Sequence, residues 1–221
     1  MRFKSLVFFC AISVFSNAQN VTEYRTWTKV SVGSKIKSER GFKFLDGCKL
    51  DVSGMYRTNS GKGFDRFIMA SELSKSPSKN LKYASELRHY LIFDDAGANK
   101  GLRQRARIRL TIERRYKTAV GDFFMRYGVQ HREVITGPGS RRTDFRARAS
   151  YAYNIKNFKW DPQFNVEYIG VAGGNFDKSI RAGISTDHKL LSGKIKIGYF
   201  YEHNPQLFDS DCHTVSIGFK F

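Results

Sequence analysis

Arginines at every second position form the most distinctive chemical pattern in this chain. Arg103, Arg105, Arg107 and Arg109 alternate with uncharged residues, and more arginines occur at the same spacing further on. Guanidinium groups bind carboxylates and phosphates through paired hydrogen bonds, so several of them on one surface favour anions. The sequence therefore predicts a basic ligand-binding patch composed of Arg103, Arg105, Arg107, Arg109, Arg126, Arg132, Arg146 and Arg148.

The same arginines also have a structural interpretation, in which they form internal ion pairs instead of a binding surface. Carboxylates lie in the same or neighbouring segments, and paired charges can fill a narrow protein interior. The candidate partners are Glu86, Glu113, Asp122, Asp144 and Glu167. Because the basic residues outnumber these acids, the anion-binding interpretation stays open beside the structural one.

Histidine and serine residues could support catalysis, but their spacing specifies no site. The histidines are His89, His131, His188, His203 and His213, and they form neither an H-x-x-x-H nor an H-E-x-x-H zinc motif. A hydrolase would need a nucleophile beside a histidine base, for which the candidates are His89 or His131 with a nearby serine. No G-x-S-x-G, Walker A or G-x-G-x-x-G motif occurs. We therefore assign no catalytic residue, no metal site and no cofactor from the sequence.

The arginine pattern belongs to extended strands. In residues 102–116, apolar side chains and arginines occupy alternate positions, which a strand separates onto two faces and a helix would mix. Glycine-, proline- and serine-rich breakers at residues 59–63, 76–78, 94–101, 137–139 and 173–175 divide such segments. Candidate strands cover residues 24–36, 48–57, 64–73, 81–92, 102–116, 123–132, 144–155, 164–170, 179–187, 194–202 and 212–221.

These segments predict an all-β chain, an antiparallel up-and-down transmembrane β-barrel of about 10–12 strands. The count of eleven is awkward, because single-chain bacterial outer-membrane barrels have even strand numbers. We therefore expect that one segment has been missed or split, or that a loop has been counted as a strand. Residues 24–36 form the least certain segment.

Several features favour a lipid-facing exterior over a buried apolar core. The best segments are longer than the roughly 5–6 residues of typical soluble strands and reach the ~9–11 needed for a tilted span. A barrel of this size would enclose more volume than its Leu, Ile and Val side chains could fill. Tyrosines gather towards strand ends, as in interfacial girdles. They are Tyr56, Tyr83, Tyr116, Tyr151, Tyr153, Tyr199 and Tyr201.

The N-terminus resembles a cleaved secretory signal. Arg2 and Lys4 precede a short apolar run, and Ser16, Asn17 and Ala18 form a small-residue cleavage site. We expect residues 1–18 to be removed and residues 19–221 to form a single barrel domain. The formal charge of the 221-residue chain is +18, and cleavage would leave about +16. In an exported protein this charge indicates anionic surfaces or solutes as partners, not nucleic acid.

Cys48 and Cys212 remain after cleavage. If the last strand closes against the first, these cysteines lie two strand spacings apart, about 9–10 Å. A disulfide requires Cα atoms within roughly 7 Å. We therefore expect free thiols.

The C-terminal residues Gly218, Phe219, Lys220 and Phe221 resemble the closing-strand signal that the barrel-assembly machinery of Gram-negative bacteria recognises. The signal ending at residues 16–19 resembles those of Bacteroidetes-type exported proteins. Together with residues 23–28, the basic strand and residues 151–153, these features resemble the family described as domain of unknown function 2490. The resemblance implies an outer-membrane barrel in contact with membrane lipid and lipopolysaccharide. It supplies no catalytic or ligand-binding residues.

Three functional hypotheses follow. The first is a non-enzymatic outer-membrane barrel, either a narrow, porin-like pore that favours anions or a structural element. The second is an outer-membrane enzyme acting on lipid or lipopolysaccharide. The third is a soluble secreted barrel with its apolar faces turned inwards around a small hydrophobic ligand. The sequence specifies neither the solute nor the oligomeric state.

Overall fold

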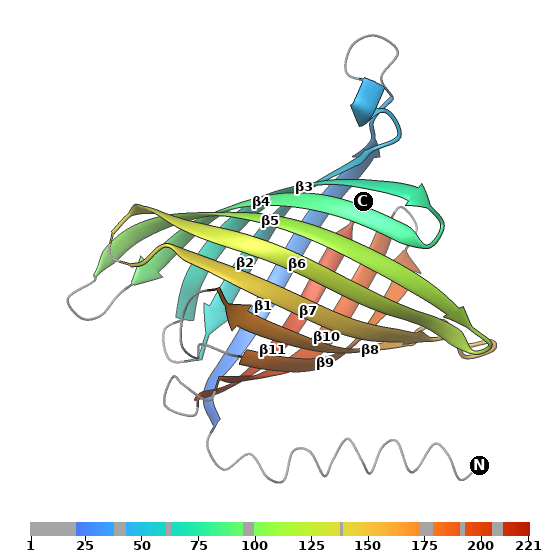
Figure 1. Ribbon diagram of the computed structural model, residues 1–221. Helices are drawn as coiled ribbons and strands as arrows, with labels where there is room; N and C mark the ends of the chain where they lie inside the picture. The colour runs from blue at the N-terminus through green and yellow to red at the C-terminus, as the bar shows by residue number, and fades with distance from the viewer. Residues whose placement is uncertain are drawn as a thin grey trace.

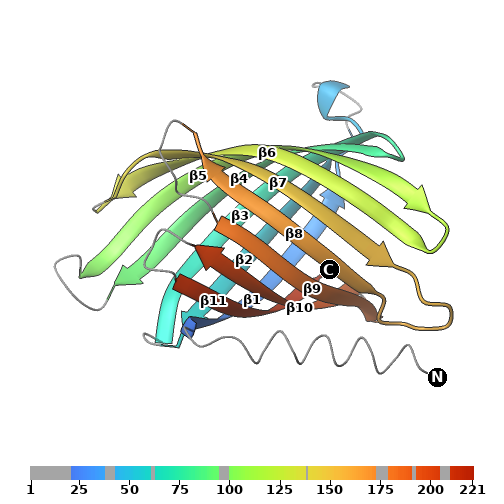
Figure 2. The ribbon, with the colours of Figure 1, turned by 60° about the horizontal axis from the view of Figure 1, so that its bottom comes forward.

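The computed structural model describes residues 21–37, 43–60, 63–94, 100–137, 139–172, 179–190, 193–204 and 210–221. They form a closed barrel of eleven strands, and neighbouring strands run side by side around the wall (Figures 1 and 2). The expected signal peptide at residues 1–18 and the expected turn at 173–175 lie outside the described residues. Within the described part, no helix is both long and apolar enough to cross a membrane.

The strands follow one another in sequence order around the wall. A single 3-10 turn, η1 (Lys43–Leu45), lies between the first two strands and projects beyond the barrel rim (Figure 1). The strands are β1 (Val21–Lys35), β2 (Lys49–Asn59), β3 (Gly63–Ser78), β4 (Leu81–Asp94), β5 (Gly101–Thr118), β6 (Gly121–Thr136), β7 (Arg142–Tyr153), β8 (Pro162–Val171), β9 (Ser179–Leu190), β10 (Gly193–Asn204) and β11 (Ser210–Lys220).

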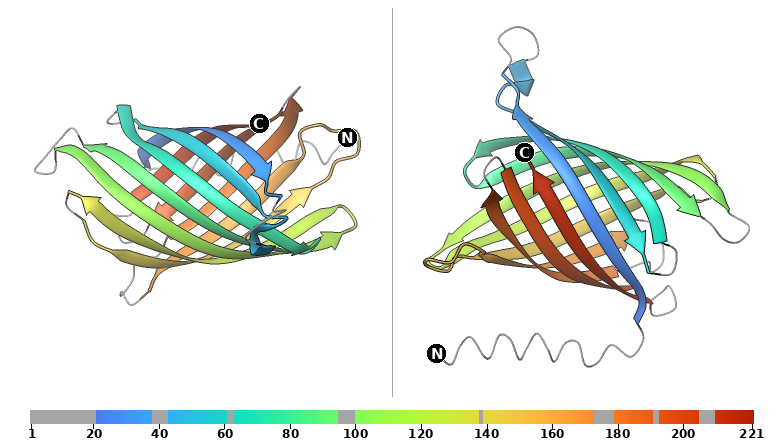
Figure 3. Two further views of the ribbon diagram at one scale, coloured as in Figure 1. Left: turned by 90° about the horizontal axis from the view of Figure 1, so that it is seen from above. Right: turned by 180° about the vertical axis from the view of Figure 1, so that it is seen from behind.

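The barrel closes through a parallel pair, while every other neighbouring pair is antiparallel. β1 lies between β2 and β11, as the rear view in Figure 3 shows, and its register with β11 runs from Val21↔Asp211 to Ser31↔Lys220. The expectation that one of the eleven segments was an error is wrong. A parallel closing pair accommodates an odd number of strands, and the doubtful N-terminal segment is a full 15-residue strand.

The prediction that residues 76–78 break the strand is also wrong, because β3 continues to Ser78. The β3–β4 register is irregular between Lys75 and Ser78, so the ladder skips Pro77. Proline lacks an amide donor and is tolerated at such strand irregularities. The described residues of the breakers at 59–63, 94–101 and 137–139 lie at strand ends or between strands. Gly63 and Gly101, with φ of 65° and 124°, begin β3 and β5 in a backbone region that glycine adopts without strain.

The two faces of the wall differ sharply in polarity. Leu110 on β5, Val129 on β6 and Val166 on β8 point outwards, with 58%, 50% and 54% of their surfaces exposed. Arg107 and Glu167 alternate with such residues, point inwards and are buried. The apolar faces are therefore outside, and the inward apolar arrangement required by a soluble barrel for hydrophobic ligands is not the one the described residues adopt.

Cys48 and Cys212 are both free, as expected, and both are buried. The strand register explains better than the strand spacing why these two thiols form no disulfide with each other. Cys48 precedes β2 at the rim where β1 ends, whereas Cys212 pairs with Glu23 near the rim where β1 begins. The two thiols therefore lie at opposite ends of the barrel.

Candidate functional site

The inward side chains surround a cavity of about 1370 Å³ with a strong excess of positive charge. Its lining contains 20 Arg and Lys residues but six Asp and Glu residues. Seven of the eight arginines in the predicted basic patch line this cavity. The exception is Arg103, whose side chain packs beside Gly137 near the rim. The lining members of the patch are Arg105, Arg107, Arg109, Arg126, Arg132, Arg146 and Arg148.

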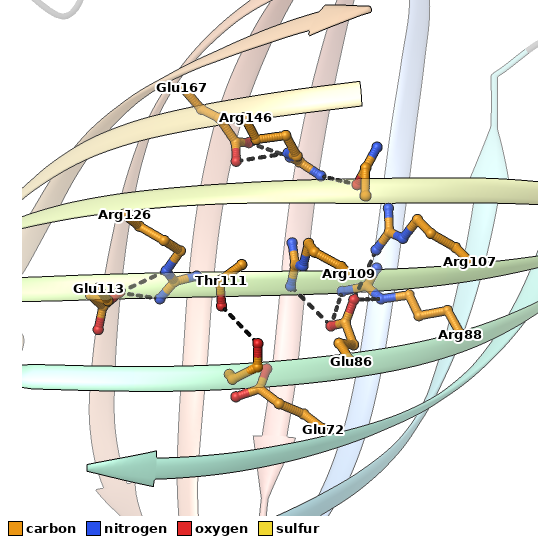
Figure 4. A network of polar contacts seen from close by, with 12 residues as sticks. Glu72, Glu86, Arg88, Arg107, Arg109, Thr111, Glu113, Arg126, Arg146 and Glu167 are labelled. Carbon is orange, nitrogen blue, oxygen red and sulfur yellow. Dashed lines mark hydrogen bonds and ion pairs between the residues drawn. The ribbon is translucent and has the colours of Figure 1, made fainter. Parts of the chain in front are cut away.

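One carboxylate organises the arginines of β4 and β5. Glu86 is 5% exposed, and its carboxylate lies 2.7 Å from Arg88 Nε. It also accepts hydrogen bonds from Arg107 and Arg109 across the β4–β5 ladder, each at 3.0 Å (Figure 4). Arginine keeps its proton in proteins, so three cations share one carboxylate and the cluster retains positive charge.

A second group links β7, β8, β9 and β10. Arg146 donates to Glu167 at 2.5 Å and to Gln130 at 3.1 Å (Figure 4). Arg181 lies 3.5 Å from Glu167 and 2.6 Å from Glu202, so charges alternate across the strands. The two arginines and the two glutamates balance in charge, and they join four consecutive strands on the inner face.

A third carboxylate, Asp144 on β7, is completely buried. It accepts hydrogen bonds from Gln130 at 2.5 Å and Arg132 at 2.9 Å, and also pairs with Arg142. A buried carboxylate is stable only with such compensation, because burial removes its hydration.

All five carboxylates of the structural interpretation are therefore paired with arginine. Glu113 pairs with Arg126, and Asp122 pairs with Arg115 at 2.5 Å, completing the set after Glu86, Asp144 and Glu167. The ion-pair network is present. It engages much of the predicted patch without cancelling the positive excess of the lining.

An aromatic group on the lumen wall was not predicted. Trp27 on β1 and Phe200 on β10 meet edge to face with centroids 4.8 Å apart. Arg57 lies over the Trp27 ring at 5.1 Å, and Arg181 lies over Phe200 at 4.7 Å. Cation–π contacts of this kind hold guanidinium groups without neutralising them. Period-two alternation in residues 24–36 was the only signal for Trp27, and it was weak.

Five lumen cations have no carboxylate partner among the described residues. Arg148 donates to Ser150 Oγ at 3.1 Å, and Lys196 donates to Gln163 Oε1 at 3.2 Å. Lys29, Lys35 and Arg105 also line the cavity and make no ion pair with a described side chain. The predicted patch included Arg148 and Arg105 but missed the three lysines, because it followed arginine spacing alone.

The histidines lie on the outer face of the wall, and none of them lines the cavity. His89 contacts Gln104 at 3.1 Å, while His131 contacts Thr143 at 2.8 Å and Glu133 at 3.3 Å. Neither histidine has a serine partner among the described residues. In that same part of the chain, no group of three His, Cys, Asp or Glu side chains is arranged to hold a metal ion.

Comparisons of this chain with protein-family models, curated proteins and solved structures find no match.

Proposed function

We propose that this chain is an outer-membrane β-barrel whose basic lumen forms a narrow, anion-favouring pore. The observation that carries the proposal is the inverted polarity of the wall, which is apolar outside and charged inside. Apolar side chains with half or more of their surface exposed suit contact with lipid, and a closed sheet leaves no unpaired edge in hydrocarbon.

Aromatic contacts on the outer face support a membrane position. Tyr56 stacks on Phe64, which contacts Phe93, near one rim. Near the opposite rim, Tyr116 packs against Phe123. Paired aromatic bands of this kind mark the two interfaces of transmembrane barrels.

The separation of the bands fits a bilayer. Tyr83 and Phe93 lie on β4, near opposite rims and ten residues apart. At ~3.4 Å per residue this is about 34 Å along the strand. A tilt of roughly 40° reduces it to about 26 Å, close to the ~25 Å apolar band of outer-membrane barrels.

The lumen charge supports anion preference. Twenty basic residues face six acids in the lining, and charged residues near the pore surface set local ion concentrations. In this proposal, the outer face contacts lipid and lipopolysaccharide, and the barrel-assembly machinery recognises β11 with the terminal Phe221.

Fractionation and electrophoresis test the membrane part of the proposal. The protein should occur in the outer-membrane pellet, and its unboiled band should migrate differently from the boiled one. A monomer that stays soluble without detergent would contradict it.

Planar-bilayer recording in a salt gradient tests the pore. We expect a reversal potential of the sign that indicates anion selectivity. The Arg105→Gln/Arg148→Gln variant should shift that potential towards zero, whereas Lys117→Gln, which removes a charge outside the cavity, should not. Absence of current or cation selectivity would overturn the pore.

A further inference from the structure

Two lysines flank a gap in the lumen wall. Lys29 on β1 and Lys196 on β10 are both cross-strand neighbours of Gly218 on β11. A Cβ atom at Gly218 would lie 3.9 Å from the Cβ atoms of both lysines. The missing side chain therefore leaves space between the Cβ atoms of two lysines on a wall that lines the cavity, and the Lys196 ammonium donates to Gln163 on β8.

Beside this gap, the lumen wall is formed by glycine and by small polar side chains. Ser216 and Gly198 face each other across β11 and β10, and Ser185 lies next to Gly198 on β9. Ser185 is 8% exposed, lines the cavity, and its Oγ has no hydrogen-bond partner. A buried hydroxyl without a partner is costly, and a bound ligand would supply one.

A third cation of the cavity lining acts electrostatically on Lys196. Arg148 on β7 has no carboxylate partner among the described residues, and its charge repels that of Lys196. Lys29 also repels Lys196. The carboxylate opposite Lys196 is Asp187, which lies 3.5 Å from Lys194. None of the three cations makes an ion pair with a described carboxylate, although Asp187 attracts Lys196, Glu167 attracts Arg148 and Glu86 attracts Lys29 at longer range.

We propose that this gap, bounded by Lys29, Lys196 and Arg148, is a binding site for a phosphate or phosphoryl group. Two ammonium groups and a guanidinium match a dianion with several acceptor oxygens, and Ser185 adds a hydroxyl donor. The inference deepens the proposed function, since it locates within the basic lumen the place where an anion is held.

Thermal unfolding of the refolded barrel in detergent tests the site, with sodium phosphate compared with sodium chloride at equal ionic strength. A ligand that binds the folded state raises the midpoint, and we expect a rise of about 3 °C or more. A second arm uses glycerol phosphate, which distinguishes a lipid-headgroup phosphate from free inorganic phosphate. A rise with either compound supports the site, and a rise with neither overturns it.

Gly218→Glu supplies the sharpest variant, because it places a carboxylate between the two lysines. It should abolish the phosphate-dependent rise, whereas Gly218→Gln, of nearly equal size, should retain more of it. The Lys29→Gln/Lys196→Gln variant should also lose the rise, and Lys117→Gln should keep it. An undiminished rise in both Gly218→Glu and the double-lysine variant would overturn the site.

The outcomes separate this inference from the proposed function. Binding is measured without a membrane potential, so a barrel that binds phosphate but passes no current disproves the pore alone. Conversely, anion-selective current without phosphate-dependent stabilisation disproves the binding site alone.

Discussion

Glu86 and the three arginines around it show how single residues hold the lumen together. Arg88, Arg107 and Arg109 would repel one another without the carboxylate between them. Removing one partner of a buried ion pair usually costs more than the pair contributes, because the remaining charge stays desolvated. Carboxylates in this lumen therefore carry more of the stability than their small number suggests.

We expect Glu86→Gln to destabilise the barrel by about 2–3 kcal/mol, a discounted value because the cavity admits water. Urea unfolding followed by tryptophan fluorescence measures the change. The matched control is Glu133→Gln, whose carboxylate is 38% exposed in a pair with the exposed Arg141. That variant should lose less than about 1 kcal/mol. Equal losses in the two variants would show that the Glu86 cluster is not structural.

Leu110 tests the lipid-facing side at the same scale. It lies midway along β5 and is 58% exposed on the outer face. In phospholipid vesicles, Leu110→Arg should cost roughly 2–4 kcal/mol, and Leu102→Arg at the strand end should cost about 0–1 kcal/mol. Unfolding titrations in vesicles compare them. Similar small costs at both positions would mean that the exterior faces water.

Among the elements, β1 decides whether the barrel closes. It pairs with β2 on one side and β11 on the other, and each register extends over most of the strand. β1 and β11 run in the same direction and pair with each other. The eleven strands therefore close into a barrel without an open sheet edge. Side-chain contacts on the inner face also join β1 to both sides: Arg57 on β2 lies over the Trp27 ring, and Phe200 on β10, beyond β11, meets that ring edge to face.

A proline in β1 should therefore prevent closure. Thr28 is exposed on the outer face and pairs with Tyr56 and Ile217. Because an unpaired backbone group in lipid costs several kcal/mol, Thr28→Pro should lower the heat-modifiable folded fraction roughly tenfold or more. Thr28→Val, which keeps the amide donor, should fold normally. Normal folding of the proline variant would place β1 outside the wall.

The first strand begins and the last strand ends at opposite rims of the barrel. β1 begins at the rim opposite Phe221, because β1 and β11 are parallel. The β5–β6 turn at residues 119–120 lies at the same rim as Phe221, because β5 and β11 both run from the opposite rim towards this one. A barrel with an even number of antiparallel strands would place both chain ends at one rim.

In a membrane, epitope tags should report this difference. One tag is inserted directly before Val21 and another between Ala119 and Val120, each in a separate variant. Antibody should reach one tag on intact cells, and both tags after permeabilisation. If both tags were accessible on intact cells, or neither, the two positions would lie on one side and the eleven-strand closure would be wrong.

The sequence by itself determined the strands and their two faces. Period-two alternation is a local property, so residues 102–116 predicted the β5 strand and placed its arginines on one face; strand length and barrel size indicated that this face points inwards. It likewise indicated the carboxylates that pair with them, because Glu86, Asp144 and Glu167 share the charged faces of their strands. These conclusions needed no knowledge of which strands meet.

Only the tertiary structure decided which residues lie opposite one another. The parallel closing pair depends on how β1 and β11 meet across the whole chain, which local patterning does not encode. The same closure brings Lys29, Gly218 and Lys196 into adjacent positions, although they are far apart in sequence. Sharing of Glu86 by three arginines also depends on register, since a shift of one residue would turn every inward side chain towards the outside.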